Sequence, residues 1–516
     1  MEHFEEHLAT VEAAKKKEST DVTMDVEPTN ESVAELTNRD AEWRKALRAS
    51  MKPKERTAIE RVKMPELDPV YRATTRTEEV NIGLTKEMAL TEAKRCLDCP
   101  KPSCMEGCPV NINIPSFVKN IERGQFLAAA KVLKNTSALP AVCGRVCPQE
   151  KQCESRCVHL KMNKPAVAIG YLERFAADYE RQSGNISIPE KDPANGIKVA
   201  VVGSGPAGLS FAGDMAKKGF DVTVFEALHE IGGVLKYGIP EFRLPNAIVD
   251  VEIENLQKMG VKFVADCIVG KTIGVKELEK QGFKGIFVAS GAGLPNFMNI
   301  PGENALNIMS SNEYLTRVNL MDAANPHTDT PINLGKNVVV VGGGNTAMDS
   351  CRTAKRLGAN VTLVYRRSEA EMPARLEEVK HAKEEGITFL TLHNPKEYEA
   401  DEKGAVKSVI LDVMQLGEPD ASGRRRPEAT GETIKLECDQ VIVAVGVSPN
   451  PLVPQSIEGL ELGRKNTIAV NEQMQSSQPA IYAGGDIVRG GATVILAMGD
   501  GRKAALNMAQ QLKPEA

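Results

Sequence analysis

Two stretches of this chain share one pattern of apolar and polar positions, an apolar run that passes through glycines into a helical segment. The first is IKVAVVGSGPAGLS at 197–210, and KNVVVVGGGNTAMDS at 336–350 repeats it about 140 residues later. Strands that are apolar on both faces belong in covered parallel sheets. Each run therefore predicts the first strand and helix of a doubly wound α/β unit. The apolar runs at 285–292 and 440–447, which also lead into glycine, predict further strands of these sheets.

The chain before these runs has a different pattern. Residues 85–179 have helical spacing with short breaks and no convincing strand, and Pro189–Gly196 is a turn-rich linker that marks a domain boundary. The first 35 or so residues are polar and aperiodic, which predicts a mobile arm. A weakly amphipathic stretch, Glu42–Leu47, and a proline-containing connector follow it. The predicted fold is therefore α/β, with two doubly wound dinucleotide-binding domains preceded by an all-helical domain.

Composition and charge exclude several classes of partner. With 516 residues the chain is too long for one core and is expected to form about three domains. A net charge of −5 and only 4% aromatic residues give no reason to expect nucleic acid as a partner. No apolar run reaches the roughly 20 residues that span a bilayer, and the N-terminus has no apolar signal core. We therefore expect a cytoplasmic protein with no membrane partner.

The first glycine loop predicts a dinucleotide site. Gly203, Gly205 and Gly208 form G-x-G-x-x-G between a predicted strand and a predicted helix. Such glycines turn the chain tightly, let the backbone approach a pyrophosphate and let helix and strand pack closely. Glu226 ends the next strand, eighteen residues after Gly208, where a carboxylate accepts hydrogen bonds from ribose hydroxyls. The alternative is a tight turn in an ordinary α/β core.

The second glycine loop is the G-x-G-x-x-A variant, made by Gly342, Gly344 and Ala347. Its next strand ends in Arg366 and Arg367, where the first unit has Glu226. A carboxylate at this place repels a 2′-phosphate, whereas guanidinium groups bind it in a bidentate way. The second loop is therefore predicted to prefer NADP over NAD. The alternative is that both arginines are a solvated strand end.

Cysteine is concentrated in the helical segment, where eight of the eleven cysteines lie. Their spacing is Cys96-x2-Cys99-x4-Cys104-x3-Cys108, then Cys143-x3-Cys147-x5-Cys153-x3-Cys157. Thiolates in groups of four are the usual ligands of iron–sulfur clusters, and a proline after the last cysteine of a run, as at Cys108, is typical of interlaced clusters. Structural zinc and disulfides are the alternatives, although the spacings fit zinc poorly and a reducing compartment disfavours disulfides.

The two loops together resemble the two-dinucleotide flavoprotein family, which includes thioredoxin-reductase-like enzymes. Three more segments are similar to that family: its late Gly-Asp motif, the helix whose N-terminus points at the flavin ring and a loop along the FAD. They are IYAGGDIV at 481–488, GGATVILAMGDGRKAA at 490–505 and EIGGVLKYGIPEFRLP at 230–245. The resemblance implies FAD at the first loop, with Asp486 on the ribityl chain, and the nicotinamide cofactor in a second domain inserted into the FAD domain.

This resemblance gives a set of cofactor residues. The implied FAD-binding residues are Gly203, Gly205, Pro206, Ala207, Gly208, Glu226, Gly233, Leu235, Arg243, Gly485, Asp486 and Thr493. The implied NADP-binding residues are Gly342, Gly344, Asn345, Thr346, Ala347, Arg366 and Arg367. No catalytic side chain is expected, because FAD and NADPH carry the chemistry. Disulfide reductases of the family have a Cys-x-x-Cys beside the flavin, whereas Cys267, Cys351 and Cys438 are isolated here, so electrons must leave the flavin by another route.

The cysteine segments narrow the resemblance. CLDCPKPSCMEGCPVNINIPSF and LPAVCGRVCPQEKQCESRC resemble the N-terminal cluster domain of the small (beta) subunit of NADPH-dependent glutamate synthase, from about Thr85 to Met508. The same module occurs in dihydropyrimidine dehydrogenase and in the large subunit of NADH-dependent ferredoxin:NADP oxidoreductase. The resemblance implies two [4Fe-4S] clusters, one on Cys96, Cys99, Cys104 and Cys157 and the other on Cys108, Cys147, Cys153 and Glu173. Cys143 is then a free thiol, and Cys143 in place of Glu173 is the alternative.

The domain boundaries and the function follow from this resemblance. The expected domains are a mobile arm and connector at 1–80, a helical iron–sulfur domain at 81–195, an FAD domain at 196–330 plus 447–516, and an inserted NADP domain at 331–446. The expected function is electron transfer from NADPH through FAD and the clusters to a large FMN- and iron–sulfur-containing subunit, for glutamate synthesis from glutamine or ammonia and 2-oxoglutarate. The alternative is the large subunit of a ferredoxin-linked NADP oxidoreductase, or of a sulfide dehydrogenase-like enzyme, with a ferredoxin reductase subunit as partner.

Overall fold

β1 (Lys198–Val202) is the apolar run before the first glycine loop, and it is buried at every position after Lys198. In the computed structural model, which describes residues 29–325, 327–420 and 425–513, it is the middle strand of a five-stranded parallel sheet. The order is β15-β4-β1-β2-β3, with bounds Ile481–Ala483, Phe283–Val288, Lys198–Val202, Asp221–Phe225 and Lys262–Val264. Its helices are α12 (Pro206–Lys217), α13 (Val234–Tyr237), α14 (Asn246–Lys258), α15 (Val275–Lys280), α19 (Leu452–Gln455), η6 (Arg464–Asn466), α20 (Asp486–Arg489) and α21 (Val494–Leu512).

The second apolar run forms β7, the middle of another five-stranded parallel sheet. Its order is β6-β13-β7-β8-β9, with bounds Ile308–Ser310, Gln440–Val443, Asn337–Val341, Asn360–Tyr365 and Thr388–Thr391. The helices of this domain are α16 (Ser311–Leu315), the π-helix η4 (Thr316–Leu320), α17 (Asn345–Arg356), η5 (Glu369–Glu371) and α18 (Leu376–Glu384). The prediction of two doubly wound parallel units is confirmed.

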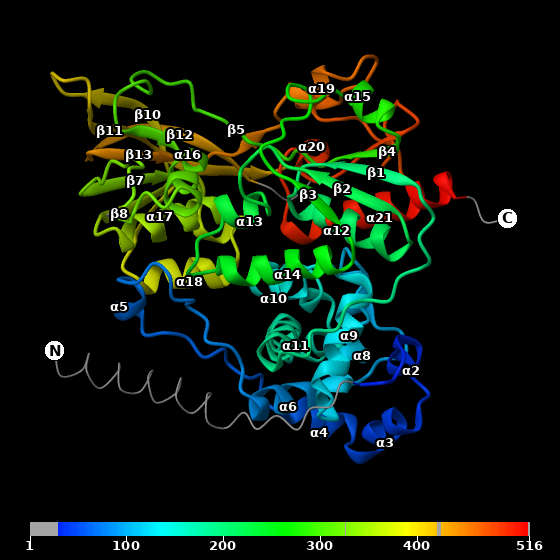
Figure 1. Ribbon diagram of the computed structural model, residues 1–516. Coiled ribbons are helices and arrows are strands. Elements are labelled where there is room, and N and C mark those ends of the chain that lie inside the picture. The colour runs from blue at the N-terminus through cyan, green and yellow to red at the C-terminus, as the bar shows by residue number, and fades with distance from the viewer. Residues whose placement is uncertain (1–28, 326, 421–424, 514–516) are drawn as a thin grey trace.

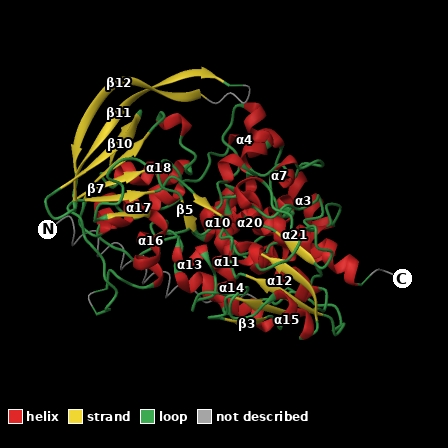
Figure 2. Cartoon of the chain, turned by 90° about the horizontal axis from the view of Figure 1, so that it is seen from above, coloured by secondary structure: helices red, strands yellow, loops and turns green. Residues whose placement is uncertain are grey.

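A third, antiparallel sheet was not expected from the sequence. It consists of β10 (His393–Ala400), β11 (Val406–Pro419) and β12 (Arg425–Glu437), and it extends from the second domain as a long arm (Figure 2). Most of β12 is exposed, and its only large apolar residues are Ile434 and Leu436. A strand of this kind carries no alternation of apolar and polar positions, so the usual signal of a half-buried strand is missing.

The second domain is inserted into the first through a short two-stranded ladder. β5 (Leu294–Pro295) and β14 (Val447–Ser448) pair antiparallel where the chain leaves the first domain and where it returns. The observed insertion begins earlier than the expected boundary at residue 331, because β6 already belongs to the second sheet. β6 has only three residues, which is too short for its apolar pattern to be recognised in the sequence.

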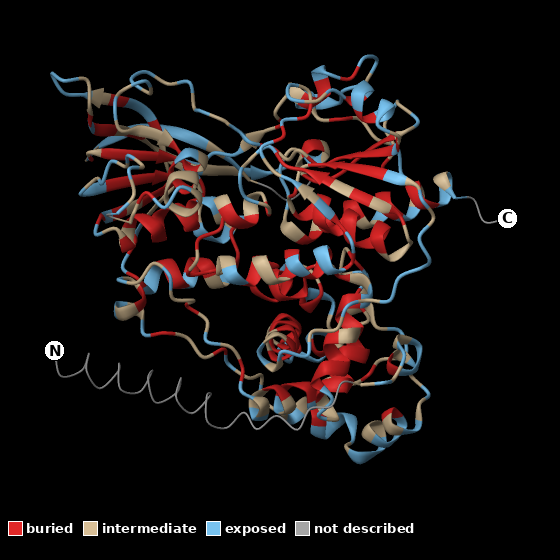
Figure 3. Ribbon diagram, in the orientation of Figure 1, coloured by how far each residue is buried: buried red, intermediate tan, exposed pale blue. Residues whose placement is uncertain are grey.

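Residues 86–183 form a helical domain in which the described chain has no strand. Its elements are α6 (Lys86–Lys94), α7 (Ser103–Glu106), α8 (Ile114–Glu122), α9 (Phe126–Thr136), α10 (Pro140–Val146), η1 (Gln149–Lys151), η2 (Glu154–Arg156), η3 (Val158–Met162) and α11 (Ile169–Ser183). α8, α9 and α11 are apolar along one side, and their contacts make the buried centre of the domain (Figure 3). The helical domain lies below the two nucleotide domains, which stand side by side (Figure 1).

The expected mobile arm and connector over 1–80 differs from what is observed after residue 28, and residues 1–28 lie outside the described part. Four short helices, α2 (Val33–Thr37), α3 (Glu42–Ser50), α4 (Pro53–Ala58) and α5 (Pro69–Arg72), pack on the rest of the chain. Buried arginines hold them: Arg44 pairs with Asp98, Arg56 with Glu122, and Arg72 with Glu385. The sequence suggested a connector because these contacts involve charged rather than apolar side chains.

The described part of the chain holds no helix that is both long enough and apolar enough to cross a membrane.

Candidate functional site

The first glycine loop has the geometry that a dinucleotide site requires. Gly203 has a φ of +102°, and a Cβ there would lie 2.5 Å from the carbonyl oxygen of Ala289. A Cβ on Gly208 would lie 2.0 Å from the carbonyl oxygen of Gly203. Around Gly205, by contrast, a Cβ would meet no atom within 4 Å. The first and third glycines therefore allow close packing, and the second leaves open space in front of the N-terminus of α12.

Glu226 stands at the end of β2 and is tied to this loop. Its Oε2 accepts hydrogen bonds from the backbone N–H of Ser204 at 2.8 Å and from its hydroxyl at 2.6 Å. Its Oε1 accepts one from the backbone N–H of Leu228 at 2.9 Å. The carboxylate is buried but borders the cavity described next, so it faces the space where a ribose bound at this loop would lie.

A cavity of about 1220 Å³ runs from the first glycine loop to the start of α17 in the second domain. Most of the residues implied as an FAD site line it: Gly203, Gly205, Pro206, Ala207, Glu226, Gly233, Arg243, Gly485, Asp486 and Thr493. Asn345 and Thr346, from the second glycine loop, line its other end. Leu235 is not in the lining; its side chain is fully buried in the core, so its contribution is packing. The cavity therefore reaches from the expected FAD site to the start of α17. The other residues implied for NADP, Gly342, Gly344, Ala347, Arg366 and Arg367, are outside its lining.

The C-terminal helix α21 begins at this cavity. Thr493 caps it, since its hydroxyl accepts a hydrogen bond from the N–H of Leu496 at 3.4 Å. Asp486 also borders the cavity, and burial raises its pKa to about 6, with a smaller contribution from Asp500. Gly501 lets α21 approach α12, because a Cβ there would lie 2.2 Å from the carbonyl oxygen of Ala207. The free N–H groups of the helix end therefore face the same space as the first loop.

The second glycine loop repeats the geometry of the first. Gly342 has a φ of +145°, and a Cβ would lie 2.4 Å from the carbonyl oxygen of Ala444. Ala347 is fully buried. Of the two arginines after β8, Arg366 is exposed, whereas Arg367 is only 8% exposed and its Nε has no hydrogen-bond partner. The two arginines therefore differ in exposure: the side chain of Arg366 is at the surface, and that of Arg367 is largely buried at the end of β8.

Arg243 has a different environment from the one that the resemblance implies. It borders the cavity, but its Nη1 donates to both carboxylate oxygens of Asp349 in α17, at 2.6 and 2.7 Å. Its Nε lies 3.2 Å from Oε1 of Glu378 in α18. The side chain thus joins the first domain to the second. Asp349 also borders the cavity and was missed in the sequence, where nothing distinguishes it from other helix-surface acids.

The eight cysteines gather into two groups in the helical domain. The first group consists of Cys96, Cys99, Cys104 and Cys157. Burial is the largest cause of the raised pKa of Cys104, and negative charge on each of the other three cysteines raises it further, because they lie close by. All four are only partly buried. A hydrogen bond with Cys143, and then burial, raise the pKa of Cys147 well above the usual value. Burial is the main cause of the raised pKa of Cys153, and charge on Glu173 adds to both shifts. Thiols with raised pKa values, such as Cys104, Cys147 and Cys153, hold their protons until a metal replaces them.

Glu173 fits the role of a ligand in the second group. It lies in α11, is 6% exposed, and its Oε1 is buried without a hydrogen-bond partner. Burial, and then the charge of Glu252, raises its pKa to about 8. Its charge acts on Cys108, Cys147 and Cys153. Cys143 is fully buried too and lies beside the same group, with a hydrogen bond to Cys147 and the charge of Glu173 acting on it. Its Sγ also donates to Sδ of Met498 in α21 at 3.4 Å.

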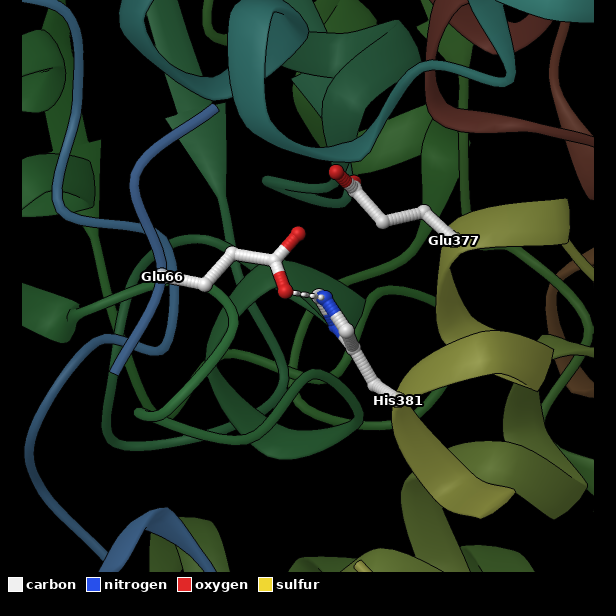
Figure 4. A group of neighbouring side chains, drawn as sticks. All are labelled: Glu66, Glu377 and His381. Carbon is white, nitrogen blue, oxygen red and sulfur yellow. Dashed lines mark ion pairs between the residues drawn. The ribbon is translucent and has the colours of Figure 1, made fainter. Parts of the chain in front are cut away.

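One other group has the side chains of a metal site, Glu66, Glu377 and His381 (Figure 4). Cations already balance these carboxylates: Lys380 and Arg72 pair with Glu66, and Arg375 pairs with Glu377. His381 Nε2 lies 3.2 Å from Oε2 of Glu66. The group is therefore a set of ion pairs between the N-terminal connector and α18, and it is not the candidate site.

Known proteins were compared with this chain by sequence and by fold. Residues 197–501 match the family described as pyridine nucleotide-disulphide oxidoreductase, and residues 72–185 match dihydropyrimidine dehydrogenase domain II, 4Fe-4S cluster. The glutamate synthase [NADPH] small chain of Azospirillum brasilense is 35% identical over 452 residues, 86% of this chain and 93% of that one. The NADP(+)-dependent formate dehydrogenase subunit beta of Moorella thermoacetica is 37% identical over 437 residues, 80% of this chain and 60% of that one. Mycobacterium tuberculosis FprA in complex with NADPH shares the fold, with a TM-score of 0.52 and 20% identity over 62% of this chain and 85% of that one.

Proposed function

This chain belongs to the pyridine nucleotide-disulphide oxidoreductase family, in the group that contains glutamate synthase [NADPH] small chains, and from this premise we propose that it is an electron-input subunit. It accepts a hydride from NADPH on FAD and delivers single electrons through iron–sulfur clusters to a partner protein. The FAD, when bound, supplies the change from a two-electron donor to one-electron acceptors.

The observation that carries this proposal is the single cavity between the two glycine loops. Residues of the first loop and the N-terminus of α21 line one part of it, and Asn345 and Thr346 line the other. Hydride transfer requires the reacting atoms to come within roughly 3–3.5 Å of each other. Two cofactors that enter from the two loops share this space, so the chain's contribution is to position them and to keep water away from the reacting atoms.

We assign the NADP preference to Arg366 and Arg367. The exposed guanidinium of Arg366 is available to a 2′-phosphate, and Arg367, which is largely buried, adds a second positive charge at the same strand end. FAD is assigned to the first loop because Glu226 there suits ribose hydroxyls and repels a phosphate.

We propose two [4Fe-4S] clusters with the ligands stated above. Thiolates and one carboxylate are a chemically reasonable donor set, and the buried, unpartnered Oε1 of Glu173 supports its inclusion. The second cysteine group would hold its cluster next to the flavin domain: a Cβ on Gly499 of α21 would lie 3.0 Å from the carbonyl oxygen of Pro109, the residue after Cys108. This contact supports a path from the cavity into the helical domain.

Anaerobic titration of the purified protein with NADPH tests the proposal. We expect the flavin absorbance to bleach and the broad absorbance of the clusters to fall in the same titration, with a paramagnetic signal from reduced clusters. A colourless preparation that contains zinc would refute it. Glu173→Ala is expected to lose one cluster's share of iron, while Cys143→Ala keeps all of it; the reverse result would move the fourth ligand to Cys143.

The partner we propose first is a large subunit of the glutamate synthase type, because the Azospirillum relative matches over 93% of its length. The formate dehydrogenase subunit from Moorella favours a second possibility, a different oxidoreductase subunit on the same module. The assay is glutamate formation from NADPH, glutamine and 2-oxoglutarate after reconstitution with a glutamate synthase large subunit. Tight binding without glutamate formation would favour the second possibility.

A further inference from the structure

The two cysteine groups differ in their distance from the surface. Cys147, Cys153 and Glu173 of the second group are buried, and Cys108 is partly buried. The first group is half-buried in all its members, Cys96, Cys99, Cys104 and Cys157. The rate of electron transfer between proteins falls steeply with distance. A partner therefore receives electrons fastest when it binds on the side where the cluster ligands lie nearest to solvent.

Two chain segments, 94–106 and 155–165, form the surface around the first group, and we call it the exit face. Side-chain hydrogen bonds to the backbone join them: the hydroxyl of Ser103 donates to the carbonyl of Arg156 at 2.7 Å, and the guanidinium of Arg95 donates to the carbonyl of Pro165 at 2.6 Å. The ring Nε2 of His159 lies 2.9 Å from the carbonyl of Arg95. The exit face is therefore a single fixed surface.

The exit face is strongly positive, although the whole chain carries a net charge of −5. Its exposed charged residues are Lys94, Lys101, Glu106, Arg156, Lys161 and Lys164. Five of these are cations and one is a carboxylate. The other charged groups of these segments, Arg95 and Asp98, are buried in ion pairs, as is Glu154 just before the second segment. Like charges gathered around one site attract a partner of opposite charge and raise its rate of association.

Two large exposed apolar side chains lie among these cations along the chain, between Arg156 and Lys164. Leu160 is 44% exposed and Met162 is 41% exposed, both in η3, which begins directly after Cys157. An apolar centre surrounded by a charged rim is typical of protein interfaces. Methionine adapts to partners of different shape.

We propose that the exit face is the docking site of the electron-accepting protein, and that this partner presents an acidic surface around a redox centre of its own. The inference rests on the proposed function, and it adds where the electrons leave and which kind of surface receives them. Contacts between redox proteins are often small and transient, so charge contributes much of the recognition.

The test compares two electron acceptors with the full-length protein loaded with FAD and clusters. The first is menadione, a small neutral quinone that takes electrons from reduced flavin, and the second is a small acidic plant-type ferredoxin. The test variant is the double charge reversal Lys161→Glu/Lys164→Glu. The matched control is Lys276→Glu/Lys280→Glu on α15, where both lysines are more than three-quarters exposed, at 79% and 76%. Iron content and absorbance spectra verify that the clusters of both variants are intact.

We expect NADPH-dependent reduction of menadione to be unchanged in both variants. With ferredoxin at low salt, kcat/KM is expected to fall about tenfold or more in the test variant and to stay unchanged in the control. The wild-type rate with ferredoxin is also expected to fall as salt rises, because salt screens exposed charges.

The outcomes separate this inference from the proposed function. If menadione is not reduced by the wild type, the proposed function fails. If menadione is reduced, the docking inference is overturned either by a wild type that does not reduce ferredoxin or by equal ferredoxin rates in the wild type and the test variant.

Discussion

The guanidinium of Arg243 binds both carboxylate oxygens of Asp349, and this ion pair connects the two dinucleotide-binding domains beside the cofactor cavity. Arg243 comes from the segment between α13 and α14, and Asp349 from the second turn of α17. Both side chains are buried. Burial lowers the pKa of Arg243, but Asp349 and Glu378 raise it by more, so the guanidinium stays charged. The pair therefore fixes the orientation of one nucleotide site relative to the other.

Arg243→Leu is expected to destabilise the protein by about 3–5 kcal/mol, because the Asp349 carboxylate stays buried and loses its main partner. The free energy of unfolding of the double variant Arg243→Leu/Asp349→Asn is expected to fall by less than the sum of the two single-variant decreases, by roughly 1–3 kcal/mol. Chemical denaturation followed by circular dichroism and flavin fluorescence measures both. Losses that simply add would show that the two residues act independently.

Much of this site could be predicted from the sequence, since glycine loops and cysteine spacings are local patterns. Gly203, Gly208 and Gly342 occupy positions that a side chain would obstruct, and such a requirement is visible in the sequence itself. The place of Arg243 could not be predicted in the same way. Its neighbours in the chain suggest a loop along the cofactor, but the partner of its long side chain is Asp349, 106 residues away.

The N-terminal connector shows the same limit. Arg72 contacts Glu385 across 313 residues of sequence, and Glu385 also binds Arg352 and Arg356. Charged residues in a polar segment ordinarily indicate solvent exposure. Here Arg72 is buried because its partners Glu384 and Glu385 come from the end of α18, and no pattern within the connector itself indicates this.

Arg366→Ala is expected to raise the KM for NADPH by about tenfold to a hundredfold, because a charge-assisted hydrogen bond to the 2′-phosphate contributes about 1.5–3 kcal/mol. The KM for NADH, which lacks this phosphate, is expected to change little. Initial rates of menadione reduction with each donor measure both values. Arg426→Ala, an exposed arginine on β12, is the control. Equal increases for NADPH and NADH would contradict the assignment of the 2′-phosphate to this residue.

Arg375 connects the second glycine loop to the helical domain, so its replacement is expected to affect NADPH. Its backbone N–H donates to Oδ1 of Asn345 at 2.8 Å, while its buried side chain donates to the carbonyl of Arg145 and to Oε1 of Gln149. Arg375→Lys cannot make the forked contact, because an ammonium is a single point of charge.

We expect Arg375→Lys to raise the KM for NADPH by about tenfold, the effect of losing roughly 1.4 kcal/mol of hydrogen bonding, with kcat for menadione nearly unchanged. Steady-state kinetics with varied NADPH separates the two parameters. Arg425→Lys in the same domain, whose arginine pairs with Glu371 near the surface, is the matched control. A fall in kcat without a change in KM would show that Arg375 acts on a step after NADPH binding.

Glu252 makes stability depend on pH near neutrality. It lies in α14, is 3% exposed, and its Oε1 accepts a hydrogen bond from the N–H of Ala141 at the start of α10, at 2.9 Å. Burial raises the pKa of Glu252 to about 7, although Lys134 and this hydrogen bond oppose the shift. The carboxyl of an unfolded chain titrates near 4.3, so folding takes up a proton between these values. The contribution of Glu252 to the free energy of unfolding is therefore fully present below about pH 4.3, and it is lost as the pH rises through 7 because the buried carboxyl must then ionise.

Glu252→Gln keeps the acceptor for Ala141 and cannot ionise. The variant is therefore expected to be more stable than the wild type at pH 8.5, by about 3 kcal/mol, and the difference is expected to shrink as the pH falls toward 5. Thermal unfolding of the loaded protein at pH 5.5, 6.5, 7.5 and 8.5 measures this trend. Glu254→Gln on the exposed side of the same helix is the control, and it is expected to leave the pH dependence unchanged. A constant difference between Glu252→Gln and the wild type at every pH would mean that Glu252 stays ionised throughout, and that the contact with α10 depends on its charge.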